Sequence, residues 1–182
     1  QHRRLQGGCN VVLTTWQRPW CDDALLPAGN LRDLPARARK ADAVVVTKCP
    51  GLPTSEEQAR WRMRLGLPAP LPLFFSAIRY AEPRSLHDVA AHVPTGPEAA
   101  ALLVTGIADP GPLLAHVRER FGTVEHLAFP DHHRFSRADQ ERIAQRFVSF
   151  AGLQKTLITT EKDAARLGGA LIDGPLEDIP IA

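Results

Sequence analysis

Six short apolar runs are the clearest pattern along the chain, at residues 10–15, 43–47, 73–80, 101–105, 124–129 and 156–160. Most of these runs are continuous and do not alternate between apolar and polar positions. Continuous runs of this length are typical of strands that are buried on both faces of a parallel sheet. We therefore expect six strands, most of them covered on both sides.

Helical patterns lie between several of these runs. Residues 55–65 follow a candidate N-cap, Thr54 or Ser55, with Glu57 shortly after it, and residues 112–121 and 137–150 have amphipathic spacing. Ser136 followed three residues later by Asp139 resembles a second capping arrangement. Because strands alternate with helices, the pattern predicts a layered α/β fold with right-handed crossovers.

One stretch interrupts this alternation. Residues 81–98 show little periodicity and contain Pro83, Pro94, Gly96 and Pro97, residues that commonly mark turns and boundaries. We therefore expect one domain over residues 1–80, a linker over residues 81–94 and a second small α/β domain over residues 95–182.

Composition narrows the function classes. The chain has 182 residues, 44% of them hydrophobic, and a formal net charge of +2; it lacks the dense basic bias of nucleic-acid binders, so no nucleic-acid partner is expected. A local basic run at residues 32–40 fits either a solvated helix face or contact with phosphates or an anionic membrane. The three cysteines form no CxxC pair, which argues against a disulfide framework or a structural zinc site.

Polar segments follow four of the predicted strands, at residues 47–50, 105–108, 130–133 and 159–163. In open parallel sheets, ligands bind beyond the carboxyl ends of the strands. These segments therefore predict a binding cleft at one edge of a sheet.

The segment Asp131-His132-His133 has the sharpest chemistry of the four, because an imidazole titrates near neutrality and suits proton transfer. Adjacent side chains in an extended segment point to opposite sides. We therefore expect Asp131 and His132 not to contact each other, and His132 to pair with a group from elsewhere. The alternative is a polar loop that caps the helix beginning at Arg137.

Two further segments have equally open interpretations. Thr159-Thr160-Glu161-Lys162-Asp163 could bind a nucleotide, or Thr160 and Asp163 could cap the helix that follows. Residues 25–33, LLPAGNLRD, could bind phosphate through arginine, or form a turn before a surface helix. The sequence contains no GxxxxGK[ST], so we do not expect this chain to hold a triphosphate by the usual phosphate loop.

Taken in order, seven segments resemble the tetraacyldisaccharide 4'-kinase family of Bacteroidetes-like bacteria. They are QHR at residues 1–3, LLPAGNLRD at 25–33, ADAVVVTKCP at 41–50, FFSAIRY at 74–80, LLVTGIADP at 102–110, FPDHHRF at 129–135 and TTEKDAARL at 159–167. The resemblance covers almost the whole chain. It implies a partial three-layer, P-loop-kinase-like α/β fold with a second small α/β domain.

The same resemblance implies ATP-dependent phosphorylation of the 4'-hydroxyl of a tetraacyldisaccharide 1-phosphate in lipid A biosynthesis. The implied partners are ATP, the lipid disaccharide and the membrane surface, with the protein peripheral at the cytoplasmic face of the inner membrane. In the family, the phosphate loop, an aspartate general base and a paired-aspartate Mg²⁺ site precede the QHR segment. We therefore expect a fragment whose main Mg²⁺ ligands lie before Gln1, with no metal ligand in this chain, weak ATP binding and no kinase activity alone.

Residue roles carried over from the family fall into two groups. His132 matches the histidine that partners the aspartate base, and Asp131 is its neighbour in the motif; these two are the expected catalytic residues. The expected nucleotide-binding residues are Gln1, His2, Arg32, Asp33, Thr160, Lys162 and Asp163. Asp33 stands where the family commonly has Glu, and His133 stands where many members have Tyr, so we expect His133 to have a supporting role.

Two other functions are weighed against the kinase. A non-catalytic nucleotide- or lipid-binding module derived from the kinase would explain the same motifs without turnover. A manganese phosphoesterase would explain Asp131-His132-His133, but that chemistry needs further aspartates in metal-binding arrangements, and the N-terminal part of the chain has no DxD.

Overall fold

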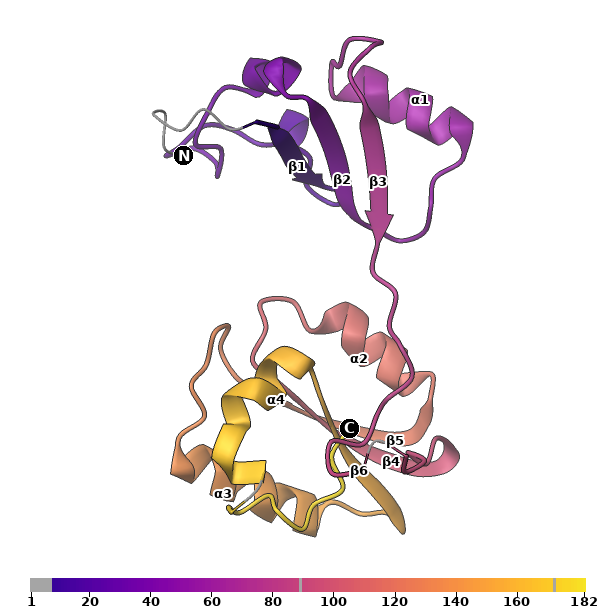
Figure 1. Cartoon of the computed structure of the whole chain (residues 1–182), viewed down its shortest axis with the longest axis vertical. Coiled ribbons are helices and arrows are strands. Elements are labelled where there is room, and N and C mark those ends of the chain that lie inside the picture. Colours follow the sequence, from indigo (N-terminus) through magenta and orange to yellow (C-terminus); the bar gives the residue numbers. More distant parts are fainter. Residues whose placement is uncertain (1–7, 89, 172) are drawn as a thin grey trace. The chain divides into compact units, whose positions relative to one another are not determined.

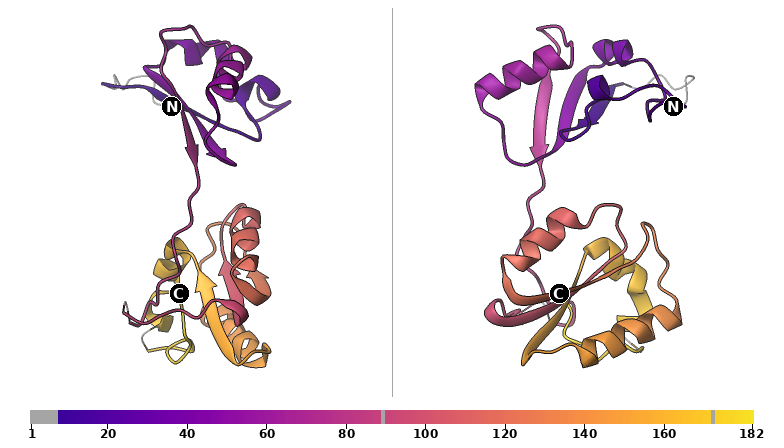
Figure 2. Two further views of the ribbon diagram at one scale, coloured as in Figure 1. Left: turned by 90° about the vertical axis from the view of Figure 1, so that its right-hand side faces the viewer. Right: turned by 180° about the vertical axis from the view of Figure 1, so that it is seen from behind.

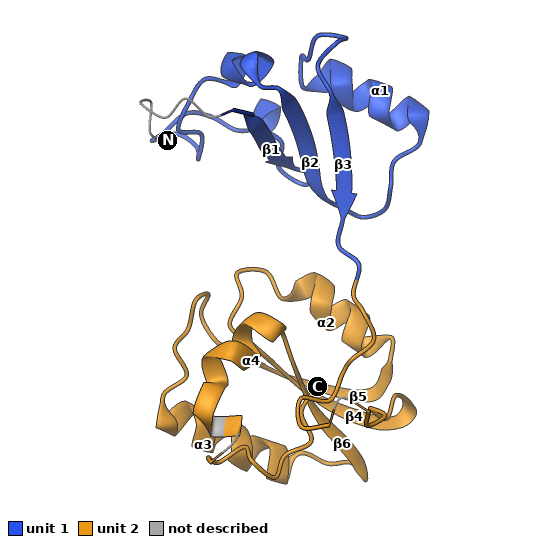
Figure 3. Ribbon diagram, viewed as in Figure 1, with its two compact units in different colours: residues 1–79 blue, residues 80–182 orange. Residues whose placement is uncertain are grey.

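The computed structural model describes residues 8–88, 90–171 and 173–182. The chain divides into two compact units, unit 1 over Gln1–Arg79 and unit 2 over Tyr80–Ala182 (Figure 3). Each unit has its own parallel sheet of three strands, so the expected α/β class with parallel sheets is confirmed.

Unit 1 contains a sheet with the strand order β1-β2-β3 (Figure 1). Its elements are β1 Val11–Thr15, a 3₁₀ helix Trp20–Asp22, a 3₁₀ helix Pro35–Lys40, β2 Ala43–Cys49, α1 Ser55–Arg64 and β3 Leu73–Ala77. The predicted N-cap of α1 is confirmed: the Thr54 hydroxyl accepts from the Glu57 N–H, and the Glu57 carboxylate accepts from the Thr54 N–H at 2.8 Å. This reciprocal capping fixes where the helix begins.

The two faces of the unit 1 sheet differ. Val44 and Val46 are fully buried. They pack with Trp61 of α1 and with Leu65, which directly follows this helix. On the opposite face, side chains such as Leu13 remain exposed, so the expectation of strands covered on both sides is wrong for unit 1 among the described residues. The cause is that α1 and the two 3₁₀ helices supply hydrophobic contacts to one face of the sheet.

Unit 2 has the strand order β5-β4-β6, with β4 in the centre. Its elements are β4 Gly96–Thr105, α2 Gly111–Arg118, β5 Phe121–Ala128, α3 Arg137–Ser149, β6 Gln154–Thr159, α4 Glu161–Leu167 and a 3₁₀ helix Gly168–Leu171. In this sheet the expectation of burial on both faces is borne out for the central strand β4, which is buried from residue 99 to residue 105, but not for β5, most of whose residues are exposed or half-buried.

Helices cover both faces of this second sheet. Leu102 and Val104 pack with Ile143 of α3, whereas Leu103 packs with Val117 of α2. Figure 1 and the right-hand view of Figure 2 show α2 and α3 on opposite sides of the strands. Unit 2 is therefore a three-layer arrangement by itself.

The predicted linker region contains no helix or strand among its described residues. It is tied to unit 2: Leu86 N–H donates to the Ile181 carbonyl at 2.9 Å, a His87 ring nitrogen lies 3.1 Å from the Ile179 carbonyl, and Val93 is buried. Ile181 in turn forms a parallel bridge with Leu157 of β6. Leu86, His87 and Val93 therefore pack on unit 2 before β4 begins.

Candidate functional site

The carboxyl ends of β4, β5 and β6 meet at one edge of unit 2. Val104 of β4 is in register with both Leu127 of β5 and Thr159 of β6. The segments that follow these strands are joined directly, since the His132 N–H donates to the Gly106 carbonyl at 3.2 Å. Three of the four predicted polar segments are therefore brought together, while the fourth, residues 47–50, belongs to unit 1.

A tight turn presents the Asp-His pair. The His133 N–H donates to the Pro130 carbonyl at 3.2 Å, and His132 occupies the third position of this turn with φ of 59°. A left-handed residue at that position is what a type II turn requires, and histidine tolerates it better than most side chains do. The local backbone therefore fixes how His132 leaves the main chain.

The turn also changes the expected relation between Asp131 and His132. The His132 N–H donates to Asp131 Oδ1 at 2.9 Å, and His132 Nε2 lies 3.6 Å from Asp131 Oδ2. The expectation that these neighbours do not meet is wrong, because the segment is a turn and not an extended strand. The expectation that His132 pairs with a distant group is confirmed, since Arg166 of α4 contacts His132 Nδ1 at 3.0 Å.

Asp163, which contacts the segment after β4, is completely buried. Its Oδ2 accepts from the Gly106 N–H at 2.9 Å and from the Thr160 hydroxyl at 2.9 Å, and its Oδ1 accepts from Arg166 at 3.1 Å. A Cβ on Gly106 would lie 3.2 Å from Asp163 Oδ1, so glycine permits this close approach. Such a buried carboxylate is tolerated because its oxygens are hydrogen-bonded and a cation is beside it.

Thr160 and Asp163 also confirm the capping interpretation of their segment. The Thr160 hydroxyl accepts from the Asp163 N–H at 3.1 Å, which makes Thr160 the N-cap of α4. Both side chains are thus engaged in internal contacts. Lys162, by contrast, is 46% exposed.

Charge at this edge is mixed, with exposed groups of both signs. Lys162 Nζ lies 3.5 Å from Asp131 Oδ1. Partial desolvation acts to raise the pKa of the Asp131 carboxyl, but the His132 ring, the His132 N–H and the Lys162 ammonium outweigh it and hold that pKa below its ordinary range. Asp131 is therefore a carboxylate at neutral pH, and His132, whose side chain is 73% exposed, is open to a ligand.

His133 faces a different set of partners. Its Nε2 lies 3.0 Å from Asp139 Oδ2, and its ring stacks on Phe129 with centroids 4.9 Å apart. Asp139 also forms a capping box with Ser136 at the start of α3, as predicted. Hydrogen bonds from the Ser136 hydroxyl and N–H, together with His133, lower the pKa of Asp139 to about 2. The two neighbouring histidines therefore have different surroundings: His132 lies at the exposed edge, and His133 contacts the start of α3.

The remaining predicted residues belong to unit 1. Arg32 and Asp33 belong to unit 1; Asp33 pairs with Arg37 at 3.1 Å, and Arg32 is exposed with no ion-pair partner among the described residues. The 3₁₀ helix Pro35–Lys40 that follows agrees with the alternative of a turn before a surface helix. Gln1 and His2 lie outside the described residues.

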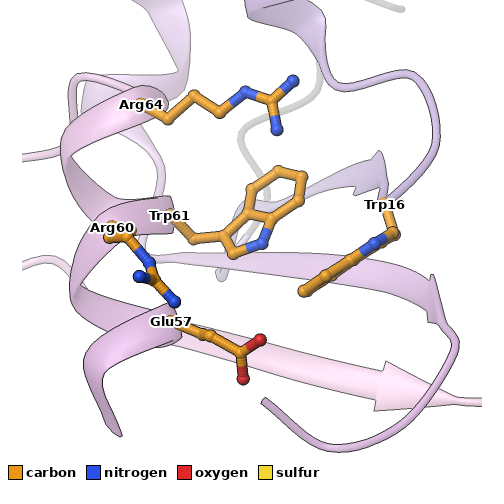
Figure 4. Close-up of a pocket in the computed structure, with 5 residues that line it drawn as sticks. All are labelled: Trp16, Glu57, Arg60, Trp61 and Arg64. Carbon is orange, nitrogen blue, oxygen red and sulfur yellow. The ribbon is translucent and has the colours of Figure 1, made fainter. Parts of the chain in front are cut away.

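Unit 1 has a pocket that the sequence did not single out (Figure 4). Trp16, which follows β1, faces Trp61 of α1 with ring centroids 4.7 Å apart, and the Arg64 guanidinium lies 4.9 Å from the Trp61 ring. Glu57 and Arg60 complete the lining of a volume of about 340 Å³. Such a pocket can stack a planar group against aromatic and guanidinium surfaces.

The main residue at this edge that sequence reasoning missed is Arg166. It lies inside the TTEKDAARL segment, three positions after Asp163. Residues three apart on a helix share a face, so the spacing alone could have suggested that Arg166 accompanies Asp163 to the site. Nothing in the sequence, however, indicated that its guanidinium reaches His132.

Within residues 8–88, 90–171 and 173–182, no three His, Cys, Asp or Glu side chains gather as a possible metal site. The helices in those same ranges include none with the length and apolar character to traverse a bilayer.

Comparison with known proteins identifies the family. Residues 1–176 match the family of Tetraacyldisaccharide-1-P 4'-kinase. The chain is 38% identical over 177 residues to the tetraacyldisaccharide 4'-kinase of Bacteroides thetaiotaomicron, covering 92% of this chain and 47% of the relative. It is 36% identical over 181 residues to the protein of the same name from Flavobacterium johnsoniae, covering 100% of this chain and 51% of the relative.

The chain thus spans about half the length of the curated relatives it matches. No solved structure gives a significant match. The family match nevertheless extends over nearly every residue, and the segments that meet at the edge of unit 2 all fall within it. The chain therefore belongs to the tetraacyldisaccharide-1-P 4'-kinase family.

Proposed function

We propose that this chain forms part of an ATP-dependent kinase that phosphorylates the 4'-hydroxyl of a tetraacyldisaccharide 1-phosphate in lipid A biosynthesis. The names of the relatives supply the reaction and the substrate. One observation links the proposal to particular residues: the exposed His132 lies beside Asp131 at an edge where three parallel strands end. The proposed location is the cytoplasmic face of the inner membrane, where the lipid substrate and the membrane surface are the partners.

The two units receive different proposed parts. Unit 1 is the C-terminal portion of a P-loop kinase core, and unit 2 is a second α/β domain. Support comes from the parallel strands of unit 1, one face of which the described residues leave exposed, and from the complete three-layer arrangement of unit 2.

His132 is the proposed catalytic partner of an aspartate base. Its imidazole orients and tunes the group that accepts the proton of the sugar hydroxyl, and Asp131 holds the turn through the His132 N–H. At the nucleotide side, Lys162 is exposed and suits an anionic phosphate, whereas Thr160 and Asp163 act by fixing the start of the helix that carries it. Gln1, His2, Arg32 and Asp33 keep their proposed nucleotide-side roles.

Phosphoryl transfer depends on positioning and on neutralising charge, and Mg²⁺ normally supplies part of the neutralisation. Among the described residues, no three His, Cys, Asp or Glu side chains gather as a possible metal site. We therefore assign no Mg²⁺ ligand here and attribute no step to the ion. This chain contributes the His132 imidazole, the Asp131 carboxylate and the exposed Lys162 ammonium.

A chimeric kinase tests the proposal. This chain replaces the matching segment of the Bacteroides thetaiotaomicron relative, and kinase activity on the lipid disaccharide is measured for the chimera and for His132→Asn. Asparagine tolerates the left-handed backbone of position 132 better than alanine, so the change removes the imidazole with little strain. We expect kcat to fall by roughly 10²-fold or more with unchanged thermal unfolding.

His92→Asn is the matched control, because His92 is an exposed histidine of the same unit and lies outside the site. Its kcat should equal that of the parent chimera. An active His132→Asn chimera would remove His132 from the mechanism. The 182-residue chain alone should show no turnover above a heat-killed sample, and an inactive parent chimera together with ATP binding by the chain would favour the non-catalytic module instead.

A further inference from the structure

Arg166 links the buried part of the site to its exposed part. Its NH1 donates to Asp163 Oδ1 at 3.1 Å and to the Gly106 carbonyl at 3.2 Å, while its NH2 lies 3.0 Å from His132 Nδ1. The Arg166 side chain is only 23% exposed, and Asp163 is completely buried. One edge of the guanidinium is therefore anchored inside the unit, and its planar geometry directs the other nitrogen at the imidazole.

This contact determines which nitrogen of His132 carries the proton. A guanidinium has donors only, so His132 Nδ1 must be the acceptor from Arg166. A neutral imidazole has one N–H, and the hydrogen bond made by one nitrogen decides where that proton sits. The proton of neutral His132 therefore resides on Nε2.

The Nε2–H of the ring remains available to donate a hydrogen bond to a ligand. Asp131 Oδ2 lies 3.6 Å from Nε2, which is longer than a direct hydrogen bond. The charged groups that face the ring are Asp131 from the turn and Arg166 from α4, with Lys162 beside Asp131. His133, in contrast, has its Nε2 engaged by Asp139 at 3.0 Å.

We infer that Arg166 is a positioning residue that holds His132 as the Nε2–H tautomer, with that N–H at the end of the ring that makes no direct hydrogen bond among the described residues. Its consequence for catalysis rests on the proposed function: if His132 orients a carboxylate base, the fixed Nε2–H is the donor that reaches it. Arg166 itself touches no reacting atom in this scheme. It acts through His132.

The tautomer is measurable in the 182-residue chain without any kinase assay. Long-range ¹H–¹⁵N NMR of the imidazoles, recorded where the rings are neutral, should find His132 Nδ1 with the shift of an unprotonated nitrogen and Nε2 with that of a protonated one. In Arg166→Met, the two shifts should move toward each other as the tautomers mix. A protonated Nδ1 in the wild-type chain, or an unchanged spectrum in Arg166→Met, would overturn the inference.

Two further variants separate positioning from folding. Arg166→Met leaves the buried Asp163 without its cation, so Arg166→Lys is measured beside it: lysine keeps a charge for Asp163 but lacks the planar fork that also reaches His132. Arg166→Lys should retain the circular dichroism of the wild-type chain and still mix the His132 tautomers. Arg137→Met removes an exposed arginine paired with Glu141 at the start of α3, and it should leave the His132 shifts unchanged.

A mutant cycle in the chimeric kinase then asks whether Arg166 acts through His132. Arg166→Lys alone should lower kcat on the order of 10-fold with KM nearly constant, and in the His132→Asn background the same change should add less than about twofold. Independent, multiplying losses would contradict a route through His132. If the NMR result holds but His132→Asn leaves kcat unchanged, the positioning stands and the proposed catalytic role of His132 is what fails.

Discussion

The two parallel sheets of this chain have the same number of strands but very different surroundings. In unit 2, Leu102 at the centre of β4 is fully buried, with neighbouring positions packed against helices on both faces. In unit 1, Leu13 is 65% exposed and Phe74 is 56% exposed, on the face opposite α1. Leu13, Val45 and Phe74 are in register across the three strands, so they form an apolar row on that face.

The difference teaches what a continuous apolar run means. Such a run predicts a strand that is suited to burial on both sides, and β4 fulfils this prediction. The runs of unit 1 carry the same pattern, yet the described residues cover only one face of their sheet. The pattern therefore indicates how apolar a strand is. It does not indicate whether one or both faces of the sheet are covered.

The largest expected effect comes from truncating a leucine in each sheet. Leu102→Ala should destabilise unit 2 by about 2–5 kcal/mol because it leaves a cavity between two covered faces, whereas Leu13→Ala should change unit 1 by no more than about 0.5 kcal/mol. All three tryptophans, Trp16, Trp20 and Trp61, lie in unit 1. Urea unfolding followed by tryptophan fluorescence thus reports unit 1, and circular dichroism reports both units. A loss above about 1 kcal/mol in Leu13→Ala would mean that this face is covered after all.

Removing a helix cap should cause a loss of stability of intermediate size in either unit. α1 begins with Thr54 and Glu57, and α3 begins with Ser136 and Asp139, in the same reciprocal arrangement. Thr54→Ala and Ser136→Ala should each cost about 1 kcal/mol, read in the fluorescence and circular dichroism transitions respectively. Ser149→Ala, near the other end of α3, is the control and should have little effect. Equal losses in Ser136→Ala and Ser149→Ala would contradict a capping role.

The smallest expected effect is on the melting temperature at acidic pH. The folded-state pKa of Asp139 is about 2, below its ordinary value of 3.8, so its contribution to stability is complete above about pH 4 and is lost as the pH falls toward about 2. Asp139→Asn should flatten the fall in the melting temperature of unit 2 across that range. Glu57→Gln should do the same for unit 1, because hydrogen bonds from the Thr54 N–H and hydroxyl lower the pKa of Glu57. An unchanged acid slope in Asp139→Asn would remove this carboxyl from the acid response.

Local patterns explain how much of the fold could be predicted from sequence. The six strands of the described residues and the caps at Ser136 and Thr160 were expected, and Thr54 was one of two candidate caps for α1, because periodicity and capping act over a few residues. The start of β4 was missed: Gly96 and Pro97 indicated a boundary, yet pairing with Phe121 of β5 extends the strand back to Gly96. That extension depends on a neighbour far along the chain, which no local pattern reveals.

The site was predictable to the same degree. The meeting of residues 106, 130–133 and 160–163 followed from the rule that parallel strands end at one edge. The left-handed turn at His132 did not follow, because the segment was expected to be extended. The reach of Arg166 did not follow either, because it depends on how α4 packs beside the turn. The roles of Asp131, His132 and the nucleotide-side residues stay predictions until the experiments above are done.

The buried Asp163 has one consequence for molecular recognition. It joins the strand end at Gly106 to α4, and through Arg166 to the imidazole, before any ligand arrives. Association with this edge would then freeze few rotamers, so little of the binding free energy would be lost to ordering the protein. Affinity at such a preorganised surface would be governed by the fit and charge of the incoming molecule.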